Sequence, residues 1–157
     1  MGTFITVSIM LIGLMILIGL LRKKPNIEGV VDYRAEGSIN DRNRVLDVHF
    51  HYQSEIEIYY KDRDSSQGSL EKAITACEQQ IAISREVASA WKKEYKDSLP
   101  RHKGFEQLAI IREKQNNYEE AIRVCEQAMK QGWDGDWKKR IQRCRKRMAK
   151  SLTKCSS

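Results

Sequence analysis

Two histidines separated by one residue, His49 and His51, are the first side chains in the sequence that suggest chemistry. Neutral imidazole is a common ligand of zinc, so a close pair of histidines invites comparison with a metal site. In a helix, however, residues i and i+2 project about 200° apart, and two such rings cannot hold one ion. Because no cluster of carboxylates or cysteines completes a ligand set, the sequence predicts no metal site.

Cysteine is the second residue type with reactive potential. The four cysteines are widely separated in the sequence, and their spacings match neither a zinc ribbon nor a CxxC redox pair. Three of them occupy apolar positions of expected helices, which indicates buried free thiols in a reducing compartment. Cys77 and Cys125 lack a neighbouring histidine that would activate them. Since GxGxxG, P-loop and GxSxG motifs are also missing, we expect no catalytic residue, no cofactor and no enzymatic activity.

Basic residues gather in the C-terminal segment. The net charge is +7, but the segment from Trp137 onward has nine basic residues and no acid, so the rest carries 19 basic against 21 acidic residues. This segment has three interpretations: the solvated face of a capping helix, a surface attracted to the anionic inner leaflet of a membrane, or a nucleic-acid-binding surface. Trp133 and Trp137 precede an apolar stripe, which favours packing in the core over stacking on bases. The predicted basic surface comprises Lys138, Lys139, Arg140, Arg143, Arg145, Lys146, Arg147 and Lys150.

Apolar residues recur with a helical period from about residue 44, which predicts that helices carry the histidines, cysteines and basic residues described above. In the first predicted helix Leu46, Phe50, Ile56 and Tyr60 share one face. A polar loop follows and ends at Ser69, a residue type that caps helix N-termini. One long helix is expected from about residue 70 to residue 97. Its predicted apolar stripe comprises Leu70, Ala73, Ile74, Cys77, Ile81, Ala88 and Trp91.

Three shorter helices are expected in the second half, at about residues 101–114, 118–130 and 136–152. Asn116 lies in the turn between the first two, and Gly132 is suited to end the second. The third helix is amphipathic, with a basic outer face. The sequence therefore predicts an all-α fold.

Residues 3–21 are uncharged and largely apolar. A helix of that length spans about 28 Å, close to the thickness of one hydrocarbon core. A cleaved signal peptide is disfavoured, because nothing basic precedes the run and no small-residue cleavage site follows it. Arg22, Lys23 and Lys24 come next, which predicts that the N-terminus lies outside and the soluble domain lies in the cytoplasm. We expect a single-pass membrane anchor at 1–24, a linker at 25–43 and a helical domain at 44–157.

Two segments of the predicted domain resemble each other. Residues 70–81 align with residues 118–129 at a constant offset, without a gap. A shared helical period would not by itself produce identical residues, so we interpret the pair as a degenerate repeat. The first copy matches the second at Ala73 and Ala121, at Ile74 and Ile122, and at Cys77 and Cys125, and both copies continue with Glu-Gln.

The second copy, with the helix before it, resembles the tetratricopeptide repeat, a helical hairpin of about 34 residues. The likeness covers about residues 101–133. It departs from the family's pattern at Arg112, where Tyr is usual, at Cys125, where an aromatic residue is usual, and at Trp133, where Pro is common. The residues that match are Phe105, Leu108, Ala109, Asn116, Tyr118, Ala121 and Ala128.

This resemblance implies about two stacked hairpins and a C-terminal capping helix, because one hairpin cannot bury its own apolar face. It also implies that peptides or protein helices bind in a groove lined by the first helices of the hairpins. The family's chaperone-tail clamp uses Lys and Asn where this chain has Glu106 and Ile110, so that partner is not implied. The implied groove residues are Lys103, Glu106, Ile110, Glu113 and Lys114.

Two hypotheses follow. The first is a membrane-tethered module that binds a protein or peptide partner. The alternative is binding of a membrane surface or of nucleic acid through the basic helix, with nucleic acid the less favoured of the two.

Overall fold

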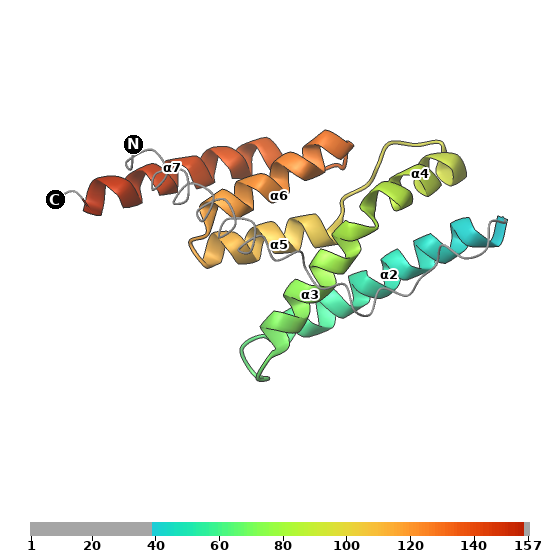
Figure 1. Ribbon diagram of the computed structural model, residues 1–157, viewed down its shortest axis with the longest axis horizontal. Helices are drawn as coiled ribbons and strands as arrows, with labels where there is room; N and C mark the ends of the chain where they lie inside the picture. The colour runs from blue at the N-terminus through green and yellow to red at the C-terminus, as the bar shows by residue number, and fades with distance from the viewer. Residues whose placement is uncertain (1–38, 156–157) are drawn as a thin grey trace, which may run out of the picture. The chain divides into compact units, whose positions relative to one another are not determined.

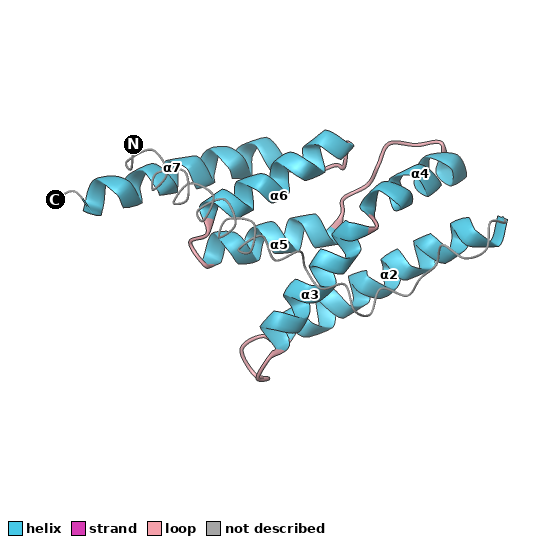
Figure 2. Ribbon diagram, viewed as in Figure 1, coloured by secondary structure: helices cyan, strands magenta, loops and turns pink. Residues whose placement is uncertain are grey.

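The computed structural model describes residues 39–155, and it describes side chains within residues 44–151. This part of the chain is all-α, with six helices and no strand, which confirms the predicted fold class (Figures 1 and 2). The helices are α2 (Ile39–Lys61), α3 (Ser69–Ala82), α4 (Ser84–Tyr95), α5 (Lys103–Lys114), α6 (Tyr118–Gln131) and α7 (Trp137–Cys155).

The predicted membrane span and most of the predicted linker lie outside the described residues. Within residues 39–155, no helix combines the length and the apolar character needed to cross a membrane. Helix α2 begins at Ile39, five residues before the predicted helix start, so the last residues assigned to the linker are helical.

In the first half of the described residues, α3 and α4 pack against α2. Helix α3 runs antiparallel to α2, and α4 continues in the same direction as α3 and also contacts α2 (Figure 1). The buried residues of α2 include Leu46, Tyr52 and Ile56. Phe50, which was predicted to lie with them, is 45% exposed, and His49 is buried in its place. The buried residues of this face are spaced by three, three and four positions, from Leu46 through His49 and Tyr52 to Ile56. This spacing leaves Phe50 at the edge of the buried face of α2.

The single long helix predicted for residues 70–97 is wrong, because α3 and α4 are separated at Ile83. The Ser84 hydroxyl donates a hydrogen bond to the Ile81 carbonyl at 2.6 Å. That carbonyl is the acceptor that residue 85 would use in a continuous helix, so the side chain competes with the helical ladder. The buried residues of α4 are Ser84, Val87 and Ala90, whereas the predicted Ala88 and Trp91 are only partly buried.

The end of α6 agrees with the prediction, and the start of α3 differs from it. Gly132 ends α6 with φ 86°, as predicted, and Asn117 begins it with a side chain that accepts the N–H of Glu120. Ser69, however, is the first residue of α3 and not its cap. Gly68 precedes it with φ 79°, a conformation that glycine adopts without steric cost.

Helix α5 is joined to the first half through a buried glutamine. Gln80 of α3 donates from Nε2 to the His49 carbonyl at 2.8 Å and accepts the Gly104 N–H at 2.6 Å. A fully buried amide with both ends bonded links α2, α3 and α5. Gly104 makes this possible, because a Cβ there would lie 2.8 Å from Gln80 Oε1 and 3.0 Å from the Cys77 carbonyl oxygen.

We expect Gly104→Ala to lower the free energy of unfolding by about 1–2 kcal/mol, since the cost of overpacking exceeds the gain in helix propensity. Urea denaturation of the full chain, followed by tryptophan fluorescence, measures the change. An increase in stability, as expected for this substitution in an uncrowded helix, would show that α3 can move away from α5 at little cost.

The second half comprises the antiparallel pair α5 and α6, with α7 packed on α6 (Figure 1). Trp133 and Trp137 are buried, which confirms their predicted place in the core. Cys77, Cys125 and Cys144 are buried free thiols, also as predicted. Burial raises the pKa of Cys77 and of Cys125 to about 12, so these thiols stay protonated at neutral pH.

Candidate functional site

The five predicted groove residues lie along one side of α5. We call Lys103, Glu106, Ile110, Glu113 and Lys114 the α5 stripe. Their spacing of three and four residues places them together on the helix, opposite the buried side chains that face α3 and α6. Residues at its two edges bond to α2 and to α7, so the stripe is bordered by two helices from distant parts of the sequence.

On the α2 edge, Lys103 Nζ lies 3.3 Å from Glu57 Oε1, and Lys114 Nζ donates to the Tyr60 hydroxyl at 2.9 Å. Phe50 precedes Glu57 by seven residues, or about two turns, so its exposed ring lies on the same side of α2. Ile58 is 58% exposed but is rotated by about 100° from Glu57, away from this edge. The α2 edge therefore offers an exposed aromatic ring beside charged groups.

On the α7 edge, Glu113 receives three arginine side chains. Its Oε1 accepts Arg143 Nε at 2.7 Å and its Oε2 accepts Arg143 Nη2 at 2.9 Å and Arg140 Nη1 at 2.8 Å. Arg147 Nη1 lies 3.3 Å from Oε1. The hydrogen bonds from Arg143 lower the pKa of Glu113 against the opposing effect of its burial, and the charges of Arg143, Arg140 and Arg147 lower it further.

This arrangement corrects one sequence-based assignment. Glu113 was predicted to line an open groove, but it is 7% exposed and engaged by α7. The helical period placed it on the surface of α5, and only the return of α7 covers it. The half-buried stripe residues Glu106 and Ile110, with Lys103, remain at the surface.

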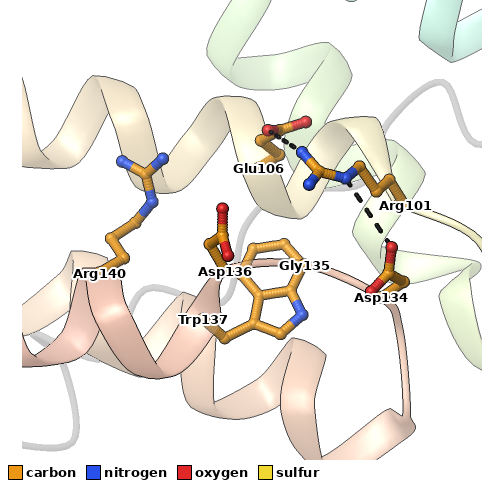
Figure 3. Close-up of a pocket in the computed structure, with 7 residues that line it drawn as sticks. All are labelled: Arg101, Glu106, Asp134, Gly135, Asp136, Trp137 and Arg140. Carbon is orange, nitrogen blue, oxygen red and sulfur yellow. Dashed lines mark hydrogen bonds and ion pairs between the residues drawn. The ribbon is translucent and has the colours of Figure 1, made fainter.

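A small hollow lies at the N-terminal end of the stripe. Arg101 Nη1 lies 3.4 Å from Glu106 Oε1, and Arg101 Nε lies 3.8 Å from Asp134 Oδ2, as Figure 3 shows. The hollow has a volume of about 40 Å³ and is also lined by Trp137 and Arg140. That space admits a few water molecules, so it is too small for an organic substrate.

The predicted basic surface is partly neutralised within the unit. Arg145 pairs with Glu126 at 3.2 Å, and Lys139 Nζ lies 3.7 Å from Asp136 Oδ1. Together with the three arginines at Glu113, at least five of its eight residues have an acidic partner in the described part of the chain. Lys138, Lys146 and Lys150 are exposed members of the same surface.

The sequence analysis missed a buried aromatic cluster at the start of α5. The His49 and His102 ring centroids are 5.0 Å apart, and His102 lies 4.6 Å from Trp133 and 4.7 Å from Phe105. Burial lowers the pKa of His49 to about 4, and burial with the neighbouring His49 lowers that of His102 to about 3, so both rings are neutral at pH 7. His51 is exposed, whereas His49 is buried, so the two rings lie on different sides of α2.

The signal for this cluster was present but ambiguous. His49 falls in the apolar register of α2, whereas His102 falls in the first turn of the helix expected at about 101–114, where its spacing from Phe105 alone does not indicate burial. In the structure His102 Nδ1 does accept the Phe105 N–H at 3.4 Å. Among residues 39–155, no group of three or more His, Cys, Asp or Glu side chains is placed to hold a metal ion.

Comparisons of this chain with protein-family models, with curated proteins and with solved structures found no match.

Proposed function

We propose that this protein is a membrane-tethered interaction module that binds a protein or peptide partner along the α5 stripe, and that it has no enzymatic activity of its own. The observation that carries the proposal is the position of the stripe between α2 and α7. Half-buried Ile110 lies at its centre, with charged residues on both sides and exposed Phe50 at the α2 edge. Apolar groups surrounded by polar ones are typical of a protein-binding surface.

The proposal includes a tetratricopeptide-like arrangement of two hairpins and a capping helix, which two sets of matching contacts support. In each copy, the glutamate directly after the cysteine pairs with an arginine of a later helix that packs against the helix of that copy. Glu78 of α3 lies 3.2 Å from Arg112 of α5, and Glu126 of α6 lies 3.2 Å from Arg145 of α7. Ala73 and Cys77 are fully buried, and so are their counterparts Ala121 and Cys125. These matching contacts are what stacked repeats would have in common, and they favour the interpretation of the two copies as a degenerate repeat.

The membrane tether in this proposal is the apolar segment at residues 3–21, with the basic residues after it on the cytoplasmic side. The alternative function, binding of a lipid surface or of nucleic acid through α7, has less support, because Glu113, Glu126 and Asp136 offset part of the positive charge of the predicted basic surface.

Site-specific photo-crosslinking in intact membranes tests the proposed surface. A photoreactive residue at position 110 should form a covalent adduct with a defined partner, and the same residue at position 58 should not, because Ile58 is equally apolar but lies away from the stripe. We then expect Ile110→Arg to reduce recovery of that partner at least about tenfold, since a desolvated charge opposes binding, whereas Ile58→Arg leaves it unchanged.

Equal adducts from positions 110 and 58, or full recovery of the partner by Ile110→Arg, would place the binding surface elsewhere. Thermal unfolding of both arginine variants serves as the control, because the comparison requires that each remains folded.

A further inference from the structure

The three arginines at Glu113 carry more charge than that residue neutralises. We call Arg140, Arg143 and Arg147 the arginine cluster. All their ion pairs in the described part of the chain go to the single carboxylate of Glu113, which leaves an excess of two positive charges. The excess is accessible, because the Arg143 and Arg147 side chains are 45% and 52% exposed.

Glu113 also orients the cluster. A guanidinium has five N–H donors, and Arg143 uses only Nε and Nη2 for Glu113, while Arg140 uses only Nη1. The bidentate bond holds the Arg143 plane in one orientation, so less side-chain entropy is lost when a second anion binds. The cluster therefore presents ordered, unused donors to the surface.

The surroundings favour a compact anion over an extended one. Glu106 lies on the same side of α5, one turn beyond Ile110, and Glu57 lies on the α2 edge. Each of these carboxylates is paired with a base, Glu106 with Arg101 and Glu57 with Lys103, so neither ion pair adds net positive charge for a long run of phosphates such as nucleic acid or a lipid surface. A partner carboxylate would compensate only one of the two excess charges, whereas a phosphorylated side chain carries nearly two negative charges at pH 7.

We propose that the arginine cluster binds a phosphorylated serine or threonine of a protein segment that lies along the α5 stripe. This inference rests on the proposed function, since Glu113 is a neighbour of Ile110 at a spacing of three residues and a segment over Ile110 reaches the cluster. Phosphorylation of the partner would then control its binding, because the phosphate supplies charge-assisted hydrogen bonds that the unmodified hydroxyl lacks.

Oriented peptide libraries test the inference. The full chain in detergent micelles is presented with degenerate peptides whose central residue is fixed as phosphoserine, aspartate or serine. We expect about tenfold greater retention of the phosphoserine library than of the other two, and loss of this preference in the double variant Arg143→Gln/Arg147→Gln. The variant should stay folded, because Glu113 keeps Arg140 as a partner, and thermal unfolding checks this.

The matched control is Lys138→Gln/Lys146→Gln, which removes the same charge from α7 outside the cluster. This control should keep the preference, and equal loss in both double variants would overturn the inference in favour of a net-charge effect. Equal retention of the phosphoserine and aspartate libraries would also overturn it. The inference would also be overturned if the arginine cluster were required for binding duplex DNA or phosphatidylserine vesicles while the chain showed no preference for phosphoserine.

The same experiment separates the two proposals. Retention of all three libraries that depends on Ile110 but not on phosphate would leave the proposed function standing and reject the phosphate site. No retention of any library by the wild-type chain, or retention unaffected by Ile110→Arg, would count against the proposed binding surface itself.

Discussion

Acidification from pH 7 to pH 5 is expected to lower the free energy of unfolding by about 4 kcal/mol, half from each buried histidine. In the unfolded chain both histidines titrate near pH 6.5, but in the folded unit burial lowers the pKa of His49 to about 4 and that of His102 to about 3. The unfolded state therefore binds more protons below pH 6.5. The stabilisation is complete above that pH and is lost as the pH falls toward 4.

Carboxylates do not explain a loss in this window. Hydrogen bonds from arginines lower the pKa of Glu113 and of Glu120 below the ordinary value of 4.5, so their contribution disappears only at more acidic pH. Urea denaturation at several pH values between 7.5 and 5, followed by tryptophan fluorescence, measures the slope. Trp133 is a local probe, because it stacks on His49 and contacts His102.

Two variants assign this acid sensitivity. His49→Phe keeps an aromatic ring in the cluster and should remove about half of the pH-dependent loss. His51→Gln is the control, since the His51 side chain is exposed, and it should leave the slope unchanged. A stability that stays flat between pH 7 and pH 5 would mean that water reaches the two rings in the folded state.

Glu113→Gln is expected to lower the free energy of unfolding by about 2–3 kcal/mol. The substitution leaves three arginines within reach of one neutral amide, so their mutual repulsion is no longer offset. The estimate is below that for a fully buried ion pair, because Arg143 and Arg147 are about half exposed and solvent screens them. High salt should restore part of the lost stability.

Glu126→Gln provides the matched control, because Glu126 also pairs with an arginine of α7 but is 52% exposed, and within the described residues Arg145 is its one ion-pair partner. It should cost about 0.5 kcal/mol or less. Thermal and urea unfolding of both variants at low and high salt measures the two stability costs and their salt dependence. Similar costs for the two substitutions would show that Glu113 acts as an ordinary surface carboxylate.

Short-range signals predicted much of the second half of the unit. The α5–α6 turn, the end of α6 at Gly132 and the buried tryptophans depend on local conformation and on helical period, which a single sequence displays. The two cysteine-containing segments share residues at a fixed offset, and their matched alanines and cysteines are fully buried.

The first half was predicted less well, because its decisive contacts are not local. The burial of His49 in place of Phe50 depends on how α2, α3 and α5 fit together around Gln80. A periodic pattern tolerates a shift of one residue or a short interruption. Packing does not, since buried polar groups must find partners and close approaches such as that at Gly104 permit only one register.

For the candidate site, the sequence alone determined which residues of α5 share a side, because that depends only on their spacing along one helix. The tertiary structure decided what borders them. Glu113 became the partner of three arginines from a distant part of the sequence, because the packing of α7 on α6 brings charges together that no local period relates.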